Sequence, residues 1–166
     1  MNTTTMDTPV GPFTILAGDD GAVRAAGFTT DVAELLTLVH PSLRADPRPR
    51  PDLGSVTTAV LSYLDGDVMA IDEVAIEQRT GGAFLGQAWD TLREVKPGHP
   101  VTYTGFAELA GRPGAIRAAA TACARNAVAL FVPCHRVVGT DGTLRGYRWG
   151  LDVKEWLLAH ERKSLS

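Results

Sequence analysis

A cysteine followed directly by two basic side chains is the feature of this sequence best suited to chemistry. Cys134 stands in the run Pro133-Cys134-His135-Arg136, at the end of the apolar segment 127–132, AVALFV. The reactive form of cysteine is the thiolate, which a nearby histidine or cation favours. Consecutive residues of an extended chain point to opposite faces, so a local turn or a bridging water is needed for these side chains to act together. Without either, Cys134 would be a buried small apolar residue.

The rest of the cysteine and histidine content narrows the chemistry. Cys123, the only other cysteine, lies in an alanine-rich segment without a flanking histidine, and we expect it to be a buried apolar residue. Two cysteines are too few for the disulfide framework of a small secreted protein, which favours a cytoplasmic location. The sequence has no Cys and His set for a structural zinc and indicates no cofactor. We also expect no signal peptide, because residues 1–12 have no basic segment followed by an apolar run, and no membrane span, because no apolar stretch approaches about 18 residues.

The charge of the chain is unevenly distributed. The net charge is −3, but residues 1–83 carry 5 Lys and Arg against 12 Asp and Glu, whereas residues 84–166 carry 11 against 7. A positive half can bind a polyanion, although imbalances of this size are also common on ordinary solvated surfaces.

The first half reads as a small α/β unit. Residues 13–16 and 23–28 are apolar segments separated by Gly-Asp-Asp-Gly, which predicts a β-hairpin. Apolar residues at helical spacing follow in 32–39 and 56–64, and residues 74–76 could form a further strand. The half contains no clustered nucleophile or phosphate loop, so we interpret residues 1–79 as an N-terminal scaffold domain.

The second half, residues 80–166, reads as mainly helical. Arg79-Thr80-Gly81-Gly82 is the candidate linker, and an apolar face over residues 84–95 predicts the first helix. Residues 104–110 and 114–126 are then separated by Gly111-Arg112-Pro113. A helix, a short turn with glycine and a second helix form the helix-turn-helix pattern, which is weakly specific on its own.

Three motifs together resemble one known family. The segments PCHRVV (133–138), RGYRWGL (145–151) and KEWLLAHE (154–161) resemble the O6-alkylguanine-DNA alkyltransferases, and TPVGPFTILAGDDGAV (8–23) is similar to the N-terminal domain of that family. The resemblance implies an RNase H-like α/β domain, followed by a C-terminal domain with a winged-helix-like helix-turn-helix. It also implies direct DNA repair, in which the alkyl group moves irreversibly to a cysteine and each molecule acts once.

The resemblance assigns roles to individual side chains. Cys134 matches the alkyl acceptor, and a hydrogen-bonded chain through water to His135 and Glu161 would take its proton. Tyr103 matches a phenol that donates a proton to the leaving guanine, and Asn126 matches a residue that orders the site. Each has a simpler alternative, because buried tyrosines usually satisfy a core hydrogen bond and asparagine often caps a helix.

The resemblance also implies how DNA is held. The second helix would enter the minor groove with its small residues, and one arginine would replace the flipped base in the stack. Arg117 matches that arginine, Ala115, Ala118 and Ala119 match the groove-facing residues, and Tyr103 is also placed at the DNA. A loop with Gly146, Tyr147 and Arg148 would close over the base.

Some positions depart from the family pattern. Ala127 stands where many relatives have proline, the run Ala118-Ala119-Ala120 replaces the more usual Ala-Val-Gly, and Arg145 adds a bulky charge to the loop. These departures bear on the backbone beside the site, the groove-facing surface and the range of alkyl groups accepted.

The expected partner is double-stranded DNA containing O6-alkylguanine, bound by a monomer or by a cooperative assembly on DNA. Two other functions fit parts of the sequence. A sensor could bind O6-alkylguanine and recruit another repair pathway, although such relatives lack the acceptor cysteine. A cysteine hydrolase or thiol redox enzyme could use Cys134 and His135, but would leave the helix-turn-helix and the positive half unexplained.

Overall fold

The computed structural model describes residues 1–166, which form two compact units. The first unit contains Met1–Arg79 together with Ala127–Phe131, and the second contains Thr80–Asn126 together with Val132–Ser166. The first unit is an α/β structure and the second is mainly helical, in line with the predicted fold class. No helix has the length and apolar character needed to cross a membrane.

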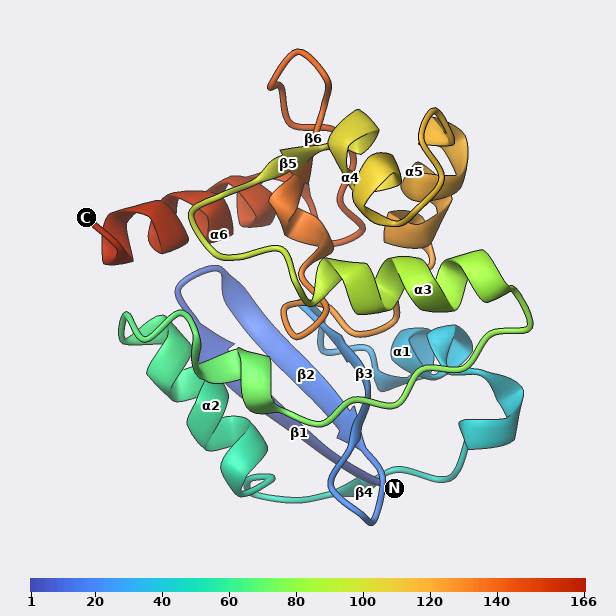
Figure 1. Ribbon diagram of the computed structural model, residues 1–166. Helices are drawn as coiled ribbons and strands as arrows, with labels where there is room; N and C mark the ends of the chain where they lie inside the picture. Colours follow the sequence, from blue (N-terminus) through green and yellow to red (C-terminus); the bar gives the residue numbers. More distant parts are fainter. The chain divides into compact units, whose positions relative to one another are not determined.

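The first unit is built on a four-stranded mixed sheet with the order β3-β2-β1-β4 (Figure 1). Strands β1 (Asn2–Thr8), β2 (Gly11–Ala17) and β3 (Val23–Gly27) are antiparallel, and the short β4 (Arg48–Pro49) runs parallel to β1. The predicted hairpin is confirmed as β2 and β3. Strand β1 was not predicted, because its sequence NTTTMDT lacks an apolar alternation, although threonine suits a half-buried strand.

Two α-helices complete this unit. Helix α1 (Val32–Leu38) begins where the Asp31 side chain accepts a hydrogen bond from the Glu34 amide, and α2 is Ser55–Leu64. Single 3-10 turns, η1 (Pro41–Leu43) and η2 (Ala70–Glu73), follow them. The strand expected over residues 74–76 is reduced to a single bridge between Ile76 and Val23.

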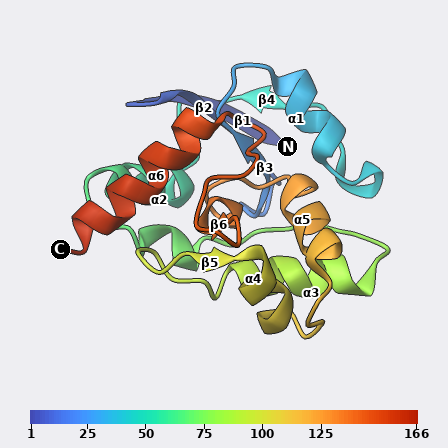
Figure 2. The same ribbon diagram turned by 90° about the horizontal axis from the view of Figure 1, so that it is seen from above.

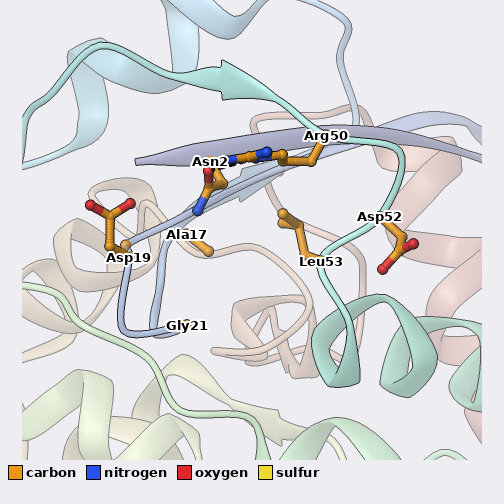
Figure 3. A pocket seen from close by; sticks show the side chains of 8 residues that line it. Asn2, Ala17, Asp19, Gly21, Arg50, Asp52 and Leu53 are labelled. Atoms are coloured by element: carbon orange, nitrogen blue, oxygen red, sulfur yellow. Dashed lines mark hydrogen bonds between the residues drawn. The ribbon is translucent and has the colours of Figure 1, made fainter.

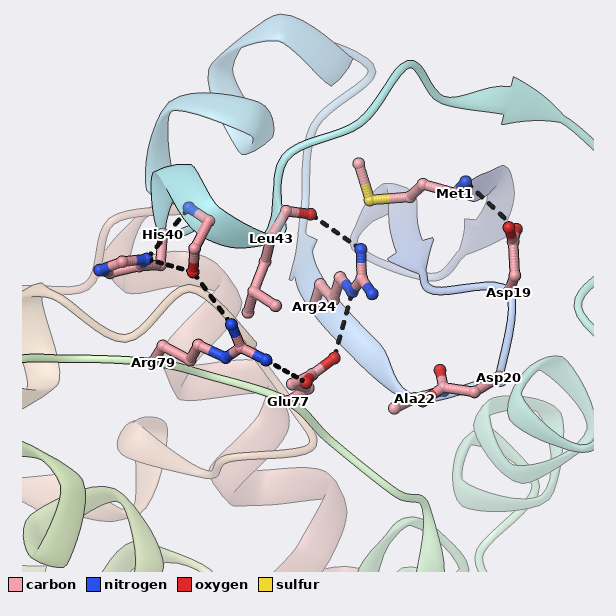
Figure 4. A network of polar contacts seen from close by, with 10 residues as sticks. Met1, Asp19, Asp20, Ala22, Arg24, His40, Leu43, Glu77 and Arg79 are labelled. Carbon is pink, nitrogen blue, oxygen red and sulfur yellow. Dashed lines mark hydrogen bonds and ion pairs between the residues drawn. The ribbon is translucent and has the colours of Figure 1, made fainter.

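A polar network ties the end of the first unit to β3 and η1 (Figure 4). Arg24 donates to the Leu43 carbonyl at 2.8 Å and pairs with Glu77 at 3.3 Å. Glu77 also pairs with Arg79, whose other guanidinium nitrogen reaches Ser42 Oγ at 3.2 Å. Exposed ion pairs contribute little stability individually, so the main effect of this network is to fix the chain direction up to residue 79.

The second unit is a cluster of helices with one short parallel strand pair (Figure 2). Its helices are α3 (Ala83–Leu92), α4 (Tyr103–Leu109), α5 (Ile116–Ala124) and α6 (Leu151–Ser164). Strand β5 (Val101–Thr102) pairs with β6 (Val137–Val138). The Trp89 indole donates to the Ala122 carbonyl at 3.0 Å, which joins α3 to α5.

The apolar segment before Cys134 is buried as predicted but is not a regular strand. Val128 makes one bridge to Ala26, and the chain then turns, with Leu130 at a φ of +72°. This left-handed conformation is uncommon for a residue with a side chain, and it stops the segment from continuing as a strand. Ala127–Phe131 therefore belongs to the first unit, although the residues before and after this segment in the sequence belong to the second unit.

Candidate active site

Cys134 begins a 3-10 turn, η3 (Cys134–Arg136), and this turn is the local geometry that the sequence left open. Its amide donates to the Val132 carbonyl at 2.8 Å, and the Arg136 amide donates to the Pro133 carbonyl at 3.0 Å. In such a turn the side chains are not held on opposite faces as they are in a strand. Strand β6 follows at once, and its pairing with β5 fixes the turn within the second unit.

His135 and Glu161, which the sequence analysis expects to act together, form a buried pair. His135 Nε2 lies 2.8 Å from Glu161 Oε2, and both side chains are fully buried. The other ring nitrogen, Nδ1, is buried without a hydrogen-bond partner. Burial lowers the pKa of His135 and outweighs the opposite effect of Glu161, so the ring is neutral.

The same carboxylate also binds Arg136, which the sequence analysis did not single out. Arg136 Nε donates to Glu161 Oε1 at 2.8 Å, and its second terminal nitrogen donates to Oε2 at 2.9 Å. Burial opposes ionisation of Glu161, but His135 and Arg136 together hold the pKa of this carboxyl well below its usual range. Glu161 is therefore an ionised, acceptor-only group.

Cys134 is 8% exposed, and its thiol lies among polar and charged groups. Burial raises its pKa, while a hydrogen bond with the Asn126 side chain and the charges of Lys154 and Arg148 act in the opposite direction. Asn126 also donates from Nδ2 to the Val132 carbonyl at 2.8 Å. One amide thus contacts both the thiol and the backbone just before it.

Lys154 is a site residue that the sequence analysis missed. Its side chain is fully buried, and its Nζ donates to the carbonyls of Arg145 at 2.8 Å and Gly146 at 3.3 Å. Burial lowers its pKa. Lys154 stands seven residues before Glu161 on α6, and this spacing puts both side chains on one helix face. The sequence feature that could have identified Lys154 is a charged residue on the same helix face as Glu161.

Two tyrosines lie in the same electrostatic environment as the thiol. Burial, together with the charges that Cys123 and Cys134 would carry, raises the pKa of Tyr103 to about 12, so its phenol keeps its proton. Its ring centroid is 6.0 Å from Lys154 Nζ. The Tyr147 hydroxyl is buried without a hydrogen-bond partner, and burial raises its pKa well above the usual value. Both phenols are available as proton donors.

Arg148 and Cys123 complete this environment. Arg148 donates to the Ala124 carbonyl at 3.2 Å, which connects the loop to the end of α5. Cys123 is only partly buried, in contrast to the full burial expected from its alanine-rich surroundings. Burial and the neighbouring Cys134 raise the pKa of the Cys123 thiol, so it is not activated.

Helix α5 presents a mixed face of small and basic residues. Arg117 is exposed, and Ala115 and Ala118 are partly exposed. Ala119, expected in a groove, is completely buried, because position 119 lies on the side of α5 that packs inside the unit. Ile116 is 43% exposed beside Arg117 and was not anticipated.

A surface hollow in the first unit offers no comparable chemistry (Figure 3). Its polar side chains are largely paired: Arg50 donates to Asn2 at 3.1 Å, and Asp19 pairs with the N-terminal amine and with Arg48. It contains no nucleophile, and no group of three His, Cys, Asp or Glu residues in residues 1–166 could hold a metal ion. The arrangement around Cys134 is therefore the candidate active site.

Comparisons with known proteins identify the family to which the chain belongs. A family model described as the DNA-binding domain of 6-O-methylguanine DNA methyltransferase matches residues 83–163. A methylated-DNA–protein-cysteine methyltransferase from Shigella flexneri is 34% identical over 158 residues, which are 93% of this chain and 91% of the relative. One from Mycolicibacterium paratuberculosis is 36% identical over 160 residues, 96% of this chain and 91% of the relative.

A solved structure extends the similarity to the whole fold. The chain is similar to Mycobacterium tuberculosis OGT crystallised in complex with DNA, with a TM-score of 0.81, 28% identity and coverage of 99% of this chain and 94% of that one. Identity above 30% over nearly the full length of the relatives is decisive for membership. The chain therefore belongs to the methylated-DNA–protein-cysteine methyltransferase family, whose members repair DNA by moving an alkyl group to a cysteine.

Proposed function

We propose that this protein moves the alkyl group of O6-alkylguanine in double-stranded DNA onto Sγ of Cys134, once per molecule. The observation that carries the proposal is the buried pair of His135 and Glu161, 2.8 Å apart, whose histidine directly follows Cys134 in the turn η3 of a chain of this family. O4-alkylthymine would be a second substrate. In the same proposal the first unit is RNase H-like and the second is winged-helix-like.

The proton of the thiol has an acceptor in this arrangement. Because Glu161 is ionised, it can only accept hydrogen bonds, and His135 must donate to it from Nε2. Nδ1 is then unprotonated and takes the Cys134 proton through one bridging water. The resulting thiolate is stabilised by the Asn126 amide and the Lys154 charge.

The transfer itself is an in-line displacement. The thiolate electron pair forms a bond to the alkyl carbon, the bond from that carbon to O6 breaks, and its electrons move into the guanine ring. The Tyr103 phenol is protonated before the transfer, because its pKa is raised, and it donates this proton to N3 of the leaving base. The products are guanine and an S-alkyl thioether, which water does not hydrolyse, so the protein is not regenerated.

The thiolate can reach the alkyl carbon only if the base leaves the stack. Unstacking costs a few kcal/mol, and an inserted guanidinium offsets part of this cost by filling the vacated space. Arg117 is the proposed side chain, because it is exposed on α5 next to small residues. Tyr147, Arg148 and Gly146 would then close over the extruded base.

Intact mass spectrometry tests the proposal. Incubation with duplex DNA containing O6-methylguanine should add one methylene, about 14 Da, and peptide mapping should locate it on Cys134. Cys134→Ala should bind the lesion but gain no mass, whereas Cys123→Ala, the matched control, should gain the full methylene. Lesion binding by the wild-type protein without any gain in mass would support the sensor function instead.

A further inference from the structure

Arg136 makes more contacts with Glu161 than the proposed transfer uses. Its Nε and one terminal nitrogen bind both carboxylate oxygens, at 2.8 and 2.9 Å. Its other terminal nitrogen donates to the Val95 carbonyl at 2.8 Å, which fixes the guanidinium plane from outside the pair. Arg136 is 1% exposed, so these contacts are shielded from water. This is the rigid, two-pronged geometry that distinguishes arginine from lysine.

The position of one proton on His135 depends on the state of Glu161. An ionised carboxylate accepts from Nε2–H and leaves Nδ1 unprotonated. A protonated carboxyl group would instead donate to Nε2, and the ring proton would then be on Nδ1. An imidazolium ring would carry protons on both nitrogens. Only the first state leaves a lone pair on Nδ1, the buried ring atom that has no partner within the protein.

We infer that Arg136 is a positioning residue for the transfer: it occupies both oxygens of Glu161, so that the carboxylate holds His135 by Nε2–H and Nδ1 is free to accept the Cys134 proton. The inference rests on the proposed role of Cys134. It adds a residue that touches neither the DNA nor the reacting sulfur, and whose contacts with the pair are made to Glu161.

Loss of the Arg136 guanidinium would put a proton on Nδ1 of His135, either because Glu161 becomes protonated or because His135 binds a second proton. Without Arg136, the buried Glu161 carboxylate would lack its compensating cation, and burial would favour its protonated form. If it stayed ionised instead, its charge would draw a second proton onto His135. Both outcomes remove the lone pair. The other charged group that acts on the ring, Lys154 from α6, opposes its protonation, and its ammonium group donates to the carbonyls of Arg145 and Gly146.

Nitrogen-15 NMR of histidine-labelled protein reads this proton directly. In the wild-type protein at pH 7, His135 should show a protonated Nε2 and an unprotonated Nδ1, with assignment by comparison with His135→Gln. Arg136→Gln should carry a proton on Nδ1 and transfer the methyl group about 10²- to 10⁴-fold more slowly, the usual contribution of a general base. Arg162→Gln, which removes an exposed arginine next to Glu161 in sequence, should match the wild type in both measurements.

The result separates positioning from packing. A folded Arg136→Gln protein with an unprotonated Nδ1 would overturn the inference even if its transfer were slow, and so would a protonated Nδ1 in the wild type. If Arg136→Gln does not fold, Arg136→Lys takes its place. Because lysine cannot bind both oxygens, the protonated fraction of Nδ1 must rise above the wild-type value, and an unchanged fraction overturns the inference.

The NMR measurement needs no DNA, so its outcome is independent of the methylene gain that tests the proposed function.

Discussion

Lys154 offers the sharpest test of how the site is assembled. Its ammonium group is the buried link between helix α6 and the loop before Tyr147, through the carbonyls of Arg145 at 2.8 Å and Gly146 at 3.3 Å. Lys154→Met keeps an unbranched apolar stem of similar length but removes the charge and all three donors. Both carbonyls then lose their partner, and Cys134 loses a cation that favours its thiolate.

The size of the effect follows from these contacts. A hydrogen bond from a charged group contributes about 1.5–3 kcal/mol, and the shorter of the two contacts has the geometry to supply it. Loss of this energy lowers the ratio of closed to open loop by about 10- to 100-fold, at about 1.4 kcal/mol for each factor of ten. The transfer rate follows the fraction of molecules with a closed loop, so it should fall by up to about 10- to 100-fold, and the higher pKa of the thiol acts in the same direction.

Two assays on the same preparation check this expectation. Single-turnover transfer from an O6-methylguanine duplex, followed by intact mass, gives the rate. Hydrogen exchange of the amides in residues 140–147 reports the opening of the loop and should become faster in Lys154→Met. Lys163→Met removes an exposed lysine from the same helix and should leave both readouts unchanged. Wild-type rates and exchange in Lys154→Met would refute the anchoring role.

Three further predictions concern other parts of the site. Arg117→Ala should slow repair of duplex DNA far more than reaction with a free O6-alkylguanine base, whereas the control Arg125→Ala should affect both reactions equally. Rapid-quench kinetics on the two substrates measure this difference, and equal losses in Arg117→Ala would contradict base flipping. Cys123→Ala should keep single-turnover transfer within about twofold of wild type, because its thiol is not activated; a larger loss would assign it a role. The folded-state pKa values of His135 and Glu161 both lie below their ordinary values, so the unfolded chain binds more protons in acid. Chemical denaturation should show stability falling as the pH drops below about 6.5 and again below about 4.3, and the second decrease should be smaller in Glu161→Gln; an unchanged second decrease would contradict the role given to this carboxylate.

The elements that carry periodic apolar residues were predictable from the sequence. The β2–β3 hairpin and helices α1, α2 and α3 lie where the spacing indicated them. Strand β1 was not predictable from periodicity, because its sequence NTTTMDT is polar and lacks an apolar alternation, although its main partner β2 follows it directly in the chain. For the apolar segment 127–132 the sequence allowed a buried strand or another extended segment, because both give the same run of apolar residues; the segment is buried and has one bridge, at Val128.

The candidate site was predictable where residues match family motifs, and less so where packing decides. The pairing of His135 with Glu161 was implied by the resemblance to the family, whereas the buried contacts of Arg136 and Lys154 were not anticipated. A charged side chain is usually exposed to solvent, and the sequence alone does not show that Arg136 and Lys154 are buried. Ala119 illustrates the opposite error: an alanine suits both a groove and a core, and only the rotation of α5 assigns it to the core.

The return of Ala127–Phe131 to the first unit has a practical consequence for dissecting the protein. No single cleavage of the backbone yields two fragments of which each contains all the residues of one unit. A fragment starting at Thr80 would carry five apolar residues cut off from the neighbours that cover them, directly upstream of the acceptor cysteine. Truncation experiments on this chain would therefore measure the misfolding of that segment together with the loss of the first unit, and point substitutions are the sounder approach.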